Sequence, residues 1–364
     1  MSEPVYIIAE AGVNHNGSIE CAFELIDVAV SAGASAVKFQ TFSSDLLASK
    51  SVPKAKYQKK IKGESESQYE MLKKLELSFE QHLQLKKYAD DKNIDFLSTA
   101  FDDISLSFLS ALNLPYYKIP SGEITNAPLL WQFGRLRKPL ILSTGASSLD
   151  EIKTAIAIVL HGFLHNYEPF SMDEVWSVWA NFSNRELLKS SLTLLHCTSA
   201  YPAPFEAINL NALKTISSTF EFPVGYSDHS LGKAVSIGAI ALGARIIEKH
   251  FTLDRNLPGP DHFCSLEPGE LKAMVEDIRS LEKAMGGFEK ECQPVEIDAR
   301  SSARQQLVAA REIKIGSSFA REDFTTQRCG EGVEPILMWD LLGKKSMRNY
   351  HPGEVICADN RKKG

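Results

Sequence analysis

Short apolar segments recur along the first 250 residues, and segments with helical periodicity separate them. Each short segment is rich in β-branched or aromatic residues and shows little polar alternation. This pattern is typical of strands buried on both faces of a parallel sheet. The predicted strands are residues 5–10, 36–41, 95–100, 116–120, 140–145, 192–197, 223–228 and 245–251.

Most intervals between these strands contain apolar residues at helical spacing, as in "SIECAFELIDVAVSAGA", "SFEQHLQLKKYADDKN" and "LGKAVSIGAIALGA". Several of these predicted helices end in Gly or Asn, which suits a helix C-cap. Eight strand–helix units in about 250 residues predict an α/β protein with a (β/α)8 TIM barrel. A doubly wound open sheet is the alternative.

The chain divides into a barrel and a smaller C-terminal part. We predict a catalytic barrel over residues 1–285, a linker over 286–303, where apolar residues are few, and a small domain over 304–364. The small domain has short strand candidates punctuated by Gly and Pro. Within the barrel, residues 43–75 and 161–190 form unusually long intervals. Such loops often serve as lids or interface elements.

Charge and composition narrow the functional classes. The formal net charge of −6 argues against a nucleic-acid-binding surface. The first residues have no basic segment followed by a long apolar run, and no run approaches the roughly 18–20 apolar residues of a membrane span. Six cysteines without C-x-x-C spacing suit reduced thiols. We therefore expect a cytoplasmic protein that binds neither nucleic acid nor membrane.

Polar residues stand at the end of every predicted strand. In a TIM barrel the chemistry gathers at these carboxyl ends, and burying so many polar groups is costly unless they bind something. The candidates are Glu10; Lys38 and Gln40; Ser98 and Thr99; Lys118, Ser121 and Glu123; Ser143 and Thr144; His196, Thr198, Ser199 and Tyr201; Ser227, Asp228 and His229; and Glu248, Lys249 and His250.

The positions of three of these residues indicate a functional role more than a structural one. Lys38 and Lys118 interrupt apolar strands, although lysine is rarely buried without a partner, and Glu10 stands in a similar setting. A single Ser or Thr at a strand end is more often a helix N-cap, and His196 suits a structural role equally well. Two lysines with clustered hydroxyl groups predict an anionic substrate that carries phosphate and carboxylate.

His229 and His250 follow neighbouring strands and could share one divalent metal ion. Neutral imidazole is a good ligand for transition metals. Two protein ligands would leave coordination positions open for substrate and water, as a catalytic metal requires. The alternative is two unrelated structural histidines.

Together the motifs resemble a known family. The segments "IIAEAGVNHNG", "AVKFQT", "YKIPSGE", "ILSTG", "HCTSAYP", "VGYSDHSLG" and "IEKHFTLDRNLPGPDH" are similar to those of the sialic acid synthases, the phosphoenolpyruvate-dependent nonulosonate synthases. The tail resembles their antifreeze-like (SAF) domain. The resemblance covers nearly the whole chain in order.

The resemblance implies a transferase of cell-surface polysaccharide biosynthesis. Carbon 3 of phosphoenolpyruvate would attack the open-chain aldehyde of an N-acetylated mannosamine-type sugar. Water would add at carbon 2, and phosphate would leave by C–O cleavage. The product would be a nine-carbon 2-keto acid.

The resemblance also implies roles for individual residues. His229 and His250 would bind a metal, usually Mn²⁺, with Mg²⁺ or Co²⁺ as alternatives, and Glu10 would act as acid/base. Phosphoenolpyruvate would be held by Lys38, Thr99, Lys118, Ser121, Ser143 and Ser227. The sugar, a metal-bound water or the supporting groups would be contacted by Gln40, Ser199, Tyr201, Asp228, Glu248 and Asp261.

In this family the tail domain lies over the barrel of the partner subunit in a domain-swapped homodimer. It donates an arginine to the N-acetyl region of the sugar, which corresponds here to Arg328. The family's Lys-Arg-Pro-Gly pattern reads "QRCGEG" in this chain, so Gln327 and Cys329 replace the neighbours of that arginine.

Several functional alternatives stay open at this point. Within the family, the product could be N-acetylneuraminate or N,N'-diacetyllegionaminate, with pseudaminic acid as a further alternative. A metal-independent aldolase could instead form a Schiff base on Lys118. A non-catalytic sugar- or carboxylate-binding protein is the third hypothesis.

Overall fold

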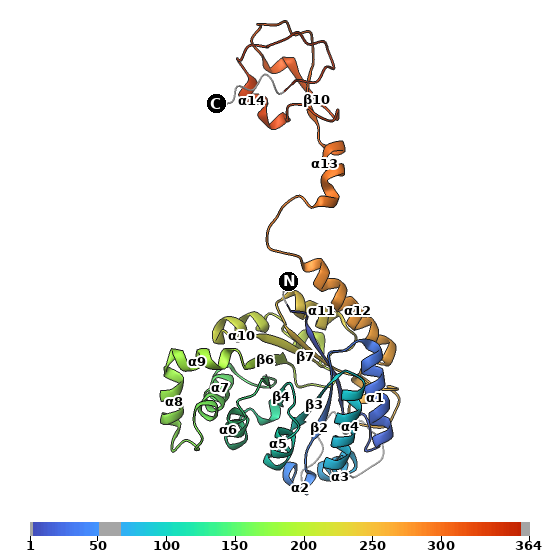
Figure 1. Cartoon of the computed structure of the whole chain (residues 1–364), viewed down its shortest axis with the longest axis vertical. Coiled ribbons are helices and arrows are strands. Elements are labelled where there is room, and N and C mark those ends of the chain that lie inside the picture. The colour runs from blue at the N-terminus through green and yellow to red at the C-terminus, as the bar shows by residue number, and fades with distance from the viewer. Residues whose placement is uncertain (1–2, 51–66, 358–364) are drawn as a thin grey trace. The chain divides into compact units, whose positions relative to one another are not determined.

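The computed structural model describes residues 3–50 and 67–357, which belong to two compact units (Figure 1). The first unit comprises Met1–Gly286 and the second Gly287–Gly364.

The first unit contains a closed barrel of eight parallel strands, in which β1 pairs with both β2 and β8. The (β/α)8 prediction is therefore confirmed, and the open sheet is excluded because the barrel has no free edge. The strands are β1 Tyr6–Gly12, β2 Ala36–Thr41, β3 Asp95–Ala100, β4 Tyr117–Ile119, β5 Leu140–Ser143, β6 Leu192–Cys197, β7 Val224–Asp228 and β8 Ile246–His250.

Helices surround the barrel and connect its strands (Figure 1). They are α1 Ile19–Ala32, α2 Ser44–Leu47, α3 Gln68–Leu75, α4 Phe79–Asp91, α5 Asp103–Ser110, α6 Ala127–Arg135, α7 Leu149–Leu164, α8 Met172–Ala180, α9 Phe182–Lys189, α10 Ala212–Phe220, α11 Ala234–Ala241 and α12 Pro268–Met285. Short 3₁₀ turns are η2 Ser121–Glu123, η3 Phe205–Ala207 and η4 His262–Cys264.

Helix α1 illustrates how local sequence sets these elements. The Ser18 side chain accepts a hydrogen bond from the Cys21 N–H and so caps the helix start. Gly33 ends the helix with a φ of 78°, a left-handed conformation that glycine adopts without steric cost. Between these caps, Ala22, Leu25 and Ala29 are buried at helical spacing and belong to the core between the helices and the strands.

Two of the three buried apolar clusters in the described part of the barrel unit form the barrel itself, and the third consists of Val13, Phe42, Met71 and Leu75. One lies between the outer face of the strands and the helices. The other fills the interior of the barrel with one inward-facing side chain from most strands: Ile8, Ala36, Leu97, Ile141, Leu195 and Ile246, with Tyr6 and Tyr116 packed against them. This inner layer makes the barrel interior a packed core.

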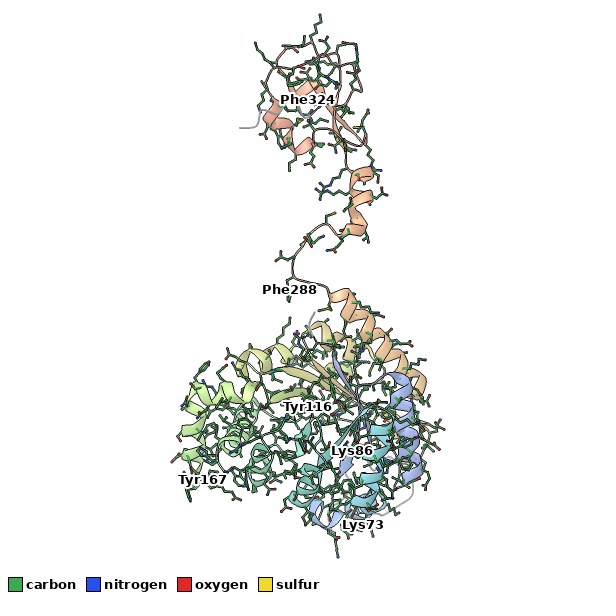
Figure 2. All side chains as sticks on the ribbon, in the orientation of Figure 1. Lys73, Lys86, Tyr116, Tyr167, Phe288 and Phe324 are labelled. Atoms are coloured by element: carbon green, nitrogen blue, oxygen red, sulfur yellow. The ribbon has the colours of Figure 1, made fainter. Side chains whose placement is uncertain are left out.

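The long interval at 161–190 folds into the end of α7 and helices α8 and α9. Tyr167 lies in the α7–α8 connection and is labelled in Figure 2. Its carbonyl accepts a 3.1 Å hydrogen bond from the Trp131 indole N–H of α6. This bond joins the inserted segment to α6. The other long interval, 43–75, contains α2 and α3, and its residues 51–66 lie outside the described part of the chain.

The second unit is small and has its own core. It comprises η5 Pro294–Glu296, α13 Ile297–Ala303, β9 Gln306–Ala309, η6 Arg321–Asp323, β10 Phe324–Gln327, η7 Pro335–Leu337 and α14 Met338–Leu341. Strands β9 and β10 pair antiparallel. The core includes Leu307, Ile313, Phe319, Phe324 and Tyr350.

The second unit contains one helix in the predicted linker and one pair of segments joined by backbone hydrogen bonds. Residues 286–303, which we predicted as a linker, contain the exposed helix α13. Residues 313–319 and 350–356 lie side by side, because Ile313 and Tyr350 exchange two backbone hydrogen bonds of 2.9 Å. The identification of this unit as an antifreeze-like domain stays a prediction.

None of the helices in the described residues is both long enough and apolar enough to cross a lipid bilayer.

Candidate active site

A polar layer lies directly above the apolar layer inside the barrel. Successive side chains of a strand point to opposite faces, so the residue two positions beyond each inner apolar residue also faces inward. In this layer the inward residues are Glu10, Lys38, Thr99, Lys118, Ser143, Cys197, Ser227 and Glu248, and all of them are buried. The strands thus bring together eight side chains from across 240 residues of sequence.

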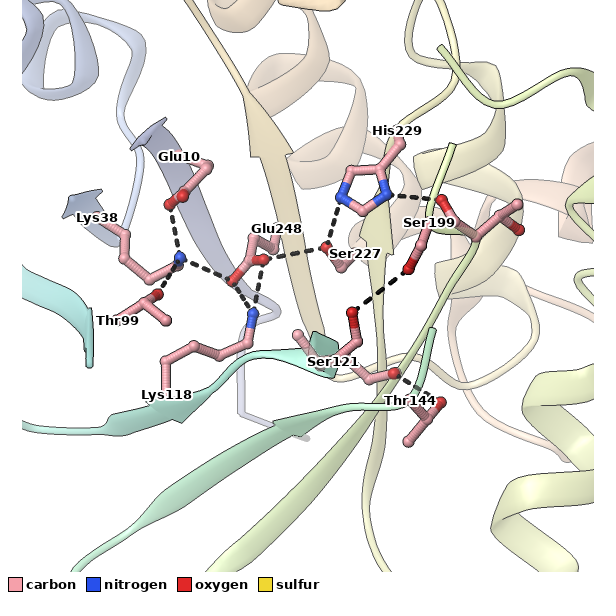
Figure 3. Close-up of polar contacts among 12 residues, drawn as sticks. Glu10, Lys38, Thr99, Lys118, Ser121, Thr144, Ser199, Ser227, His229 and Glu248 are labelled. Atoms are coloured by element: carbon pink, nitrogen blue, oxygen red, sulfur yellow. Dashed lines mark hydrogen bonds and ion pairs between the residues drawn. The ribbon is translucent and has the colours of Figure 1, made fainter. Parts of the chain in front are cut away.

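Lys38 lies at the centre of one half of this layer (Figure 3). Its Nζ is 2.7 Å from the Glu10 carboxylate and donates a 2.8 Å hydrogen bond to Thr99 Oγ1. The Glu248 carboxylate is 3.6 Å away. The buried ammonium group is therefore fully surrounded by acceptors.

Lys118 and Glu248 form the other half of the layer (Figure 3). Lys118 Nζ donates to both carboxylate oxygens of Glu248, at 2.8 and 2.9 Å. Ser227 Oγ donates to Glu248 Oε1 at 3.0 Å. Glu248 therefore connects the two lysines, and we infer that a bound anion would compete with it for them.

Burial and charge separate the proton affinities of the two glutamates. Burial raises the pKa of Glu10 to about 7, with Glu248 adding to the effect and Lys38 opposing it. Burial also acts against ionised Glu248, but Lys118 and Lys38 outweigh it and lower the Glu248 pKa. Glu248 is thus a fixed anion, whereas Glu10 can hold or release a proton near neutral pH.

His229 and His250 lie next to this layer, with ring centroids 5.8 Å apart. His229 Nδ1 is 2.8 Å from the Thr198 carbonyl oxygen, which can only accept, so Nδ1 carries the proton, and Nε2, 3.4 Å from Ser227 Oγ, keeps a lone pair. His250 Nδ1 is buried without a hydrogen-bond partner. Burial lowers the pKa of both rings, so both are neutral.

The donor set fits a divalent metal ion held by two imidazoles. Both rings are neutral, and His229 has the hydrogen bond to a carbonyl that typically orients a metal-binding histidine. The described part of the chain contains no group of three or more His, Cys, Asp or Glu side chains placed to hold a metal. A metal at these two residues would therefore depend on water or substrate for its other ligands.

Gly12 marks the point where three predicted site residues converge. Its φ is +54°, and a Cβ atom built on it would lie 3.2 Å from His250 Cε1. The same point is 3.4 Å from Gln40 Nε2 and 3.4 Å from Glu10 Oε1. Glu10 Oε1 and His250 thus face a common space, while Glu10 Oε2 contacts Lys38.

Gly145, which follows β5, is a second glycine on which side chains of several strands converge. A Cβ atom at this position would lie 2.3 Å from Ser199 Oγ, 2.8 Å from Cys197 Sγ and 3.3 Å from Ser121 Oγ. Ser121 and Ser199 are themselves hydrogen-bonded at 3.3 Å. Ser143 neighbours Cys197. The predicted hydroxyl groups of β4, β5 and β6 are therefore gathered in one place.

Tyr201 joins the two histidines. Its ring centroid is 4.2 Å from that of His229 and 5.9 Å from that of His250. Tyr201 thus covers the side of the histidine pair, and its contact with substrate stays a prediction.

Asp228 and His196 belong to the outer face of the barrel. Asp228 is buried among Ser230, Ser236 and Lys249 and does not join the polar layer. His196 donates through Nε2 to the Ile208 carbonyl at 2.8 Å, which is a structural contact. Substrate contact by Asp228 therefore has no support in this geometry.

Asp261 lies in the loop after β8 and is buried, which raises its pKa to about 6. Its carbonyl accepts a 2.7 Å hydrogen bond from Ser265 Oγ. Asn14, in the "NHNG" segment, donates to the same Oγ at 3.0 Å. The loops after β1 and β8 are thus tied together. Arg328 is exposed in the second unit, directly after β10.

The sequence analysis missed the contribution of Cys197, Gly12 and Gly145. A signal for Cys197 was present, because it stands two residues beyond the apolar Leu195 on the same strand. The glycines gave no such signal. Their importance depends on side chains that approach from other strands.

The sequence is similar to a known protein family over most of its length. The sequence model of the NeuB family matches residues 25–290, more than half of the chain. The chain belongs to the NeuB family. Relatives of this NeuB protein include the N,N'-diacetyllegionaminic acid synthase of Legionella pneumophila, 43% identical over 355 residues, which are 98% of this chain and 94% of the relative. The Campylobacter jejuni protein of the same name is 43% identical over 96% of this chain and 98% of its own.

A solved structure agrees with this assignment. The N-acetylneuraminic acid synthetase of Leptospira borgpetersenii, crystallised with citrate, superposes on the NeuB chain with a TM-score of 0.65. It is 35% identical and covers 82% of this chain and 90% of its own. Since the relatives are synthases that match almost end to end, this NeuB protein is an enzyme of the same type.

Proposed function

We propose that this enzyme condenses phosphoenolpyruvate, water and an N-acetylated mannosamine-type sugar into a nine-carbon nonulosonic acid and inorganic phosphate. Carbon 3 of phosphoenolpyruvate forms a bond to the aldehyde carbon of the open-chain sugar, and the aldehyde oxygen takes a proton to become a hydroxyl group. Water adds to carbon 2. The bond between carbon 2 and the phosphate oxygen breaks, which leaves a ketone and free phosphate.

The identity of the sugar substrate is a further step of the proposal, and three sugars are candidates. Two relatives that are 43% identical are named N,N'-diacetyllegionaminic acid synthase, so 2,4-diacetamido-2,4,6-trideoxymannose is the first candidate. N-acetylmannosamine is the second, since a Leptospira structure at 35% identity is a sialic acid synthetase. A Campylobacter jejuni protein named pseudaminic acid synthase is 33% identical, which makes that product the third candidate.

The buried polar layer is the observation that carries the proposal. Lys38 and Lys118 can bind the phosphate and carboxylate of phosphoenolpyruvate through charge-assisted hydrogen bonds. When Glu10 is protonated, two lysines face the single anion Glu248, so the layer has a net positive charge that suits an anionic ligand. We place the phosphate among the hydroxyl groups near Gly145.

Glu10 is the proposed acid/base. Lys38 holds its Oε2, and Oε1 faces the space shared with His250, so Oε1 is the atom that would exchange a proton with the substrate. Its pKa of about 7 allows both directions of transfer at neutral pH.

We further propose that His229 and His250 hold a divalent metal ion, Mn²⁺ first, with Mg²⁺ or Co²⁺ as alternatives. When bound, such an ion supplies Lewis-acid polarisation of the sugar aldehyde. EDTA should abolish activity, and Mn²⁺ should restore it. Full activity of the dialysed enzyme in EDTA would exclude this role.

A substrate panel tests the reaction itself. Phosphoenolpyruvate labelled with ¹⁸O at its bridging oxygen is incubated with each candidate sugar, and kcat/KM is compared. We expect a nonulosonic acid from at least one N-acetylated sugar, with the label in the released phosphate. Label in the sugar product would contradict C–O cleavage, and no product with any sugar would refute the proposed function.

The competing Schiff-base aldolase is tested by the same mixtures. Burial lowers the pKa of Lys118, as a nucleophilic lysine requires, but both oxygens of Glu248 engage its ammonium group. We expect borohydride to trap no substrate on Lys118. A borohydride-stable adduct at this residue, together with activity in EDTA, would favour the aldolase.

A further inference from the structure

Asp228 and Lys249 form a buried ion pair on the outer wall of the barrel. Their charged atoms are 3.1 Å apart, and the side chains are 0% and 1% exposed. Asp228 Oδ1 also accepts from the backbone N–H and hydroxyl of Ser230, at 2.8 and 2.7 Å. Its Oδ2 accepts from Ser236 Oγ of α11 at 2.6 Å. Lys249 in turn donates to the Ser230 carbonyl.

The pair stands directly between the strand ends that carry the histidines. In the β7–β8 register, Asp228 is opposite Lys249, and Ser227 is opposite Glu248. Because side chains alternate along a strand, Asp228 and Lys249 point outward where their neighbours point inward. His229 follows Asp228, and His250 follows Lys249.

The contacts of Asp228 and Lys249 hold the backbone on both sides of His229. Asp228 precedes this histidine, and Ser230, which follows it, is bound at its N–H, hydroxyl and carbonyl groups. The His229 ring itself is held by the 2.8 Å bond from Nδ1 to the Thr198 carbonyl and by Ser227 Oγ, 3.4 Å from Nε2, and the His229 carbonyl accepts a 2.8 Å hydrogen bond from the Ala203 N–H. The outer contacts therefore fix the backbone from which the ring reaches the Thr198 carbonyl.

The stability of the fold does not explain this arrangement. Other strands place apolar residues such as Ala9, Phe39 and Leu142 on the outer wall. A buried ion pair is often no more stabilising than apolar residues of the same volume. What directed polar contacts supply, and apolar packing does not, is a fixed geometry.

We propose that Asp228 and Lys249 are a positioning pair that sets the placement of the His229 and His250 rings, and through them the affinity for the metal ion. This inference rests on the proposed metal site. It gives Asp228 a role different from the substrate contact expected from sequence.

The test compares Lys249→Met with wild type by two readouts on the full chain. Isothermal titration of the metal-free protein with Mn²⁺ measures affinity. Nitrogen-15 spectra of labelled histidine rings measure the tautomer of His229, whose signal is identified by its loss in His229→Gln. We expect a 10- to 100-fold higher Kd for Mn²⁺, as is typical when a group supporting a metal ligand is removed. We also expect the single Nδ1–H tautomer to be lost.

Leu85→Ala is the matched control, because Leu85 is fully buried on α4, away from β7 and β8, and its loss destabilises the barrel without touching the pair. If Lys249→Met does not fold, two milder variants replace it. Asp228→Asn combined with Lys249→Met leaves no unpaired buried charge. Ser236→Ala removes one hydrogen bond from Asp228 and should shift both readouts less, in the same direction.

The outcomes separate this inference from the metal proposal. Unchanged Mn²⁺ affinity within twofold and an unchanged His229 tautomer in a folded Lys249→Met variant would overturn the positioning role. An equal effect in Leu85→Ala would overturn it too. If wild type binds no Mn²⁺, the metal site is refuted, and the ring spectra still decide whether the pair positions His229.

Discussion

The raised pKa of Glu10 makes the stability of the barrel depend on pH in a way that Glu10→Gln should remove. Folding moves this pKa from 4.5 to about 7, mainly through burial. Between these values the folded protein binds a proton that the unfolded chain has released. Stability therefore falls as pH rises through this window. Gln has nearly the same shape as Glu and cannot ionise. The Glu10→Gln variant should therefore not lose this stability as pH rises.

The size of the effect follows from the shift. One pKa unit corresponds to about 1.4 kcal/mol, so a rise from 4.5 to about 7 is worth about 3 kcal/mol in total. Most of this loss occurs between pH 5 and pH 8. We expect the free energy of unfolding of Glu10→Gln, relative to wild type, to be about 2–3 kcal/mol more favourable at pH 8 than at pH 5. Buried histidines contribute equally to both proteins and cancel in the difference.

Urea unfolding followed by tryptophan fluorescence measures this difference. The Trp339→Phe background restricts the signal to the barrel unit, because Trp339 is in α14 and the other tryptophans are Trp131, Trp176 and Trp179. Glu80→Gln, at an exposed glutamate in the first turn of α4, is the control. The difference between its free energy of unfolding and that of wild type should be the same at pH 5 and pH 8. A relative stability of Glu10→Gln that is the same at both pH values, or that falls toward pH 8, would show that burial does not control this carboxyl group.

Three further predictions concern the site and the subunit arrangement. Gly145→Ala should raise the KM for phosphoenolpyruvate at least tenfold, because its Cβ would lie 2.3 Å from Ser199 Oγ. The control Gly269→Ala has open space around the new Cβ and should leave this KM unchanged. Equal KM values for the two variants would contradict a steric effect at Gly145. His196→Phe should lower the free energy of unfolding by about 1–2 kcal/mol by leaving a carbonyl unpaired and keep kcat/KM within twofold; a tenfold loss of kcat/KM would instead give this histidine a role in the reaction. If the homodimer shares its sites, mixing inactive Glu10→Gln and inactive Arg328→Ala chains should restore part of the activity, and proven mixed dimers without activity would argue against a shared site.

The fold was predictable because its signals are local and repeated. Strands and helices alternate eight times, and each carries its own apolar pattern and caps, as in the segment from Ser18 to Gly33. Eight units favoured a closed barrel, but parallel strands with helical crossovers bury both faces of an open doubly wound sheet as well, so only the pairing of β1 with β8 settled closure. The polar residues at strand ends also pointed to the end of the barrel where the buried polar layer lies.

The sequence by itself did not determine which strand-end residues share the site. Ser227 and Asp228 are adjacent and equally polar, but the alternation of the strand sends the first inward and the second outward. A strand that is buried on both faces has apolar residues on both, so its sequence does not reveal which set faces the interior. Only the register with Glu248 and Lys249 on β8 decided this.

Tertiary structure also decided the chemistry of each charged group. Glu10 and Glu248 are the same residue type on the neighbouring strands β1 and β8, and both are buried. Their pKa values move in opposite directions because Glu248 contacts Lys118 and Lys38, whereas Glu10 contacts Lys38 alone. The sequence supplied the two carboxylates and the two lysines. Their distances, which barrel closure sets across more than 200 residues, determined which carboxylate stays ionised and which one can carry a proton.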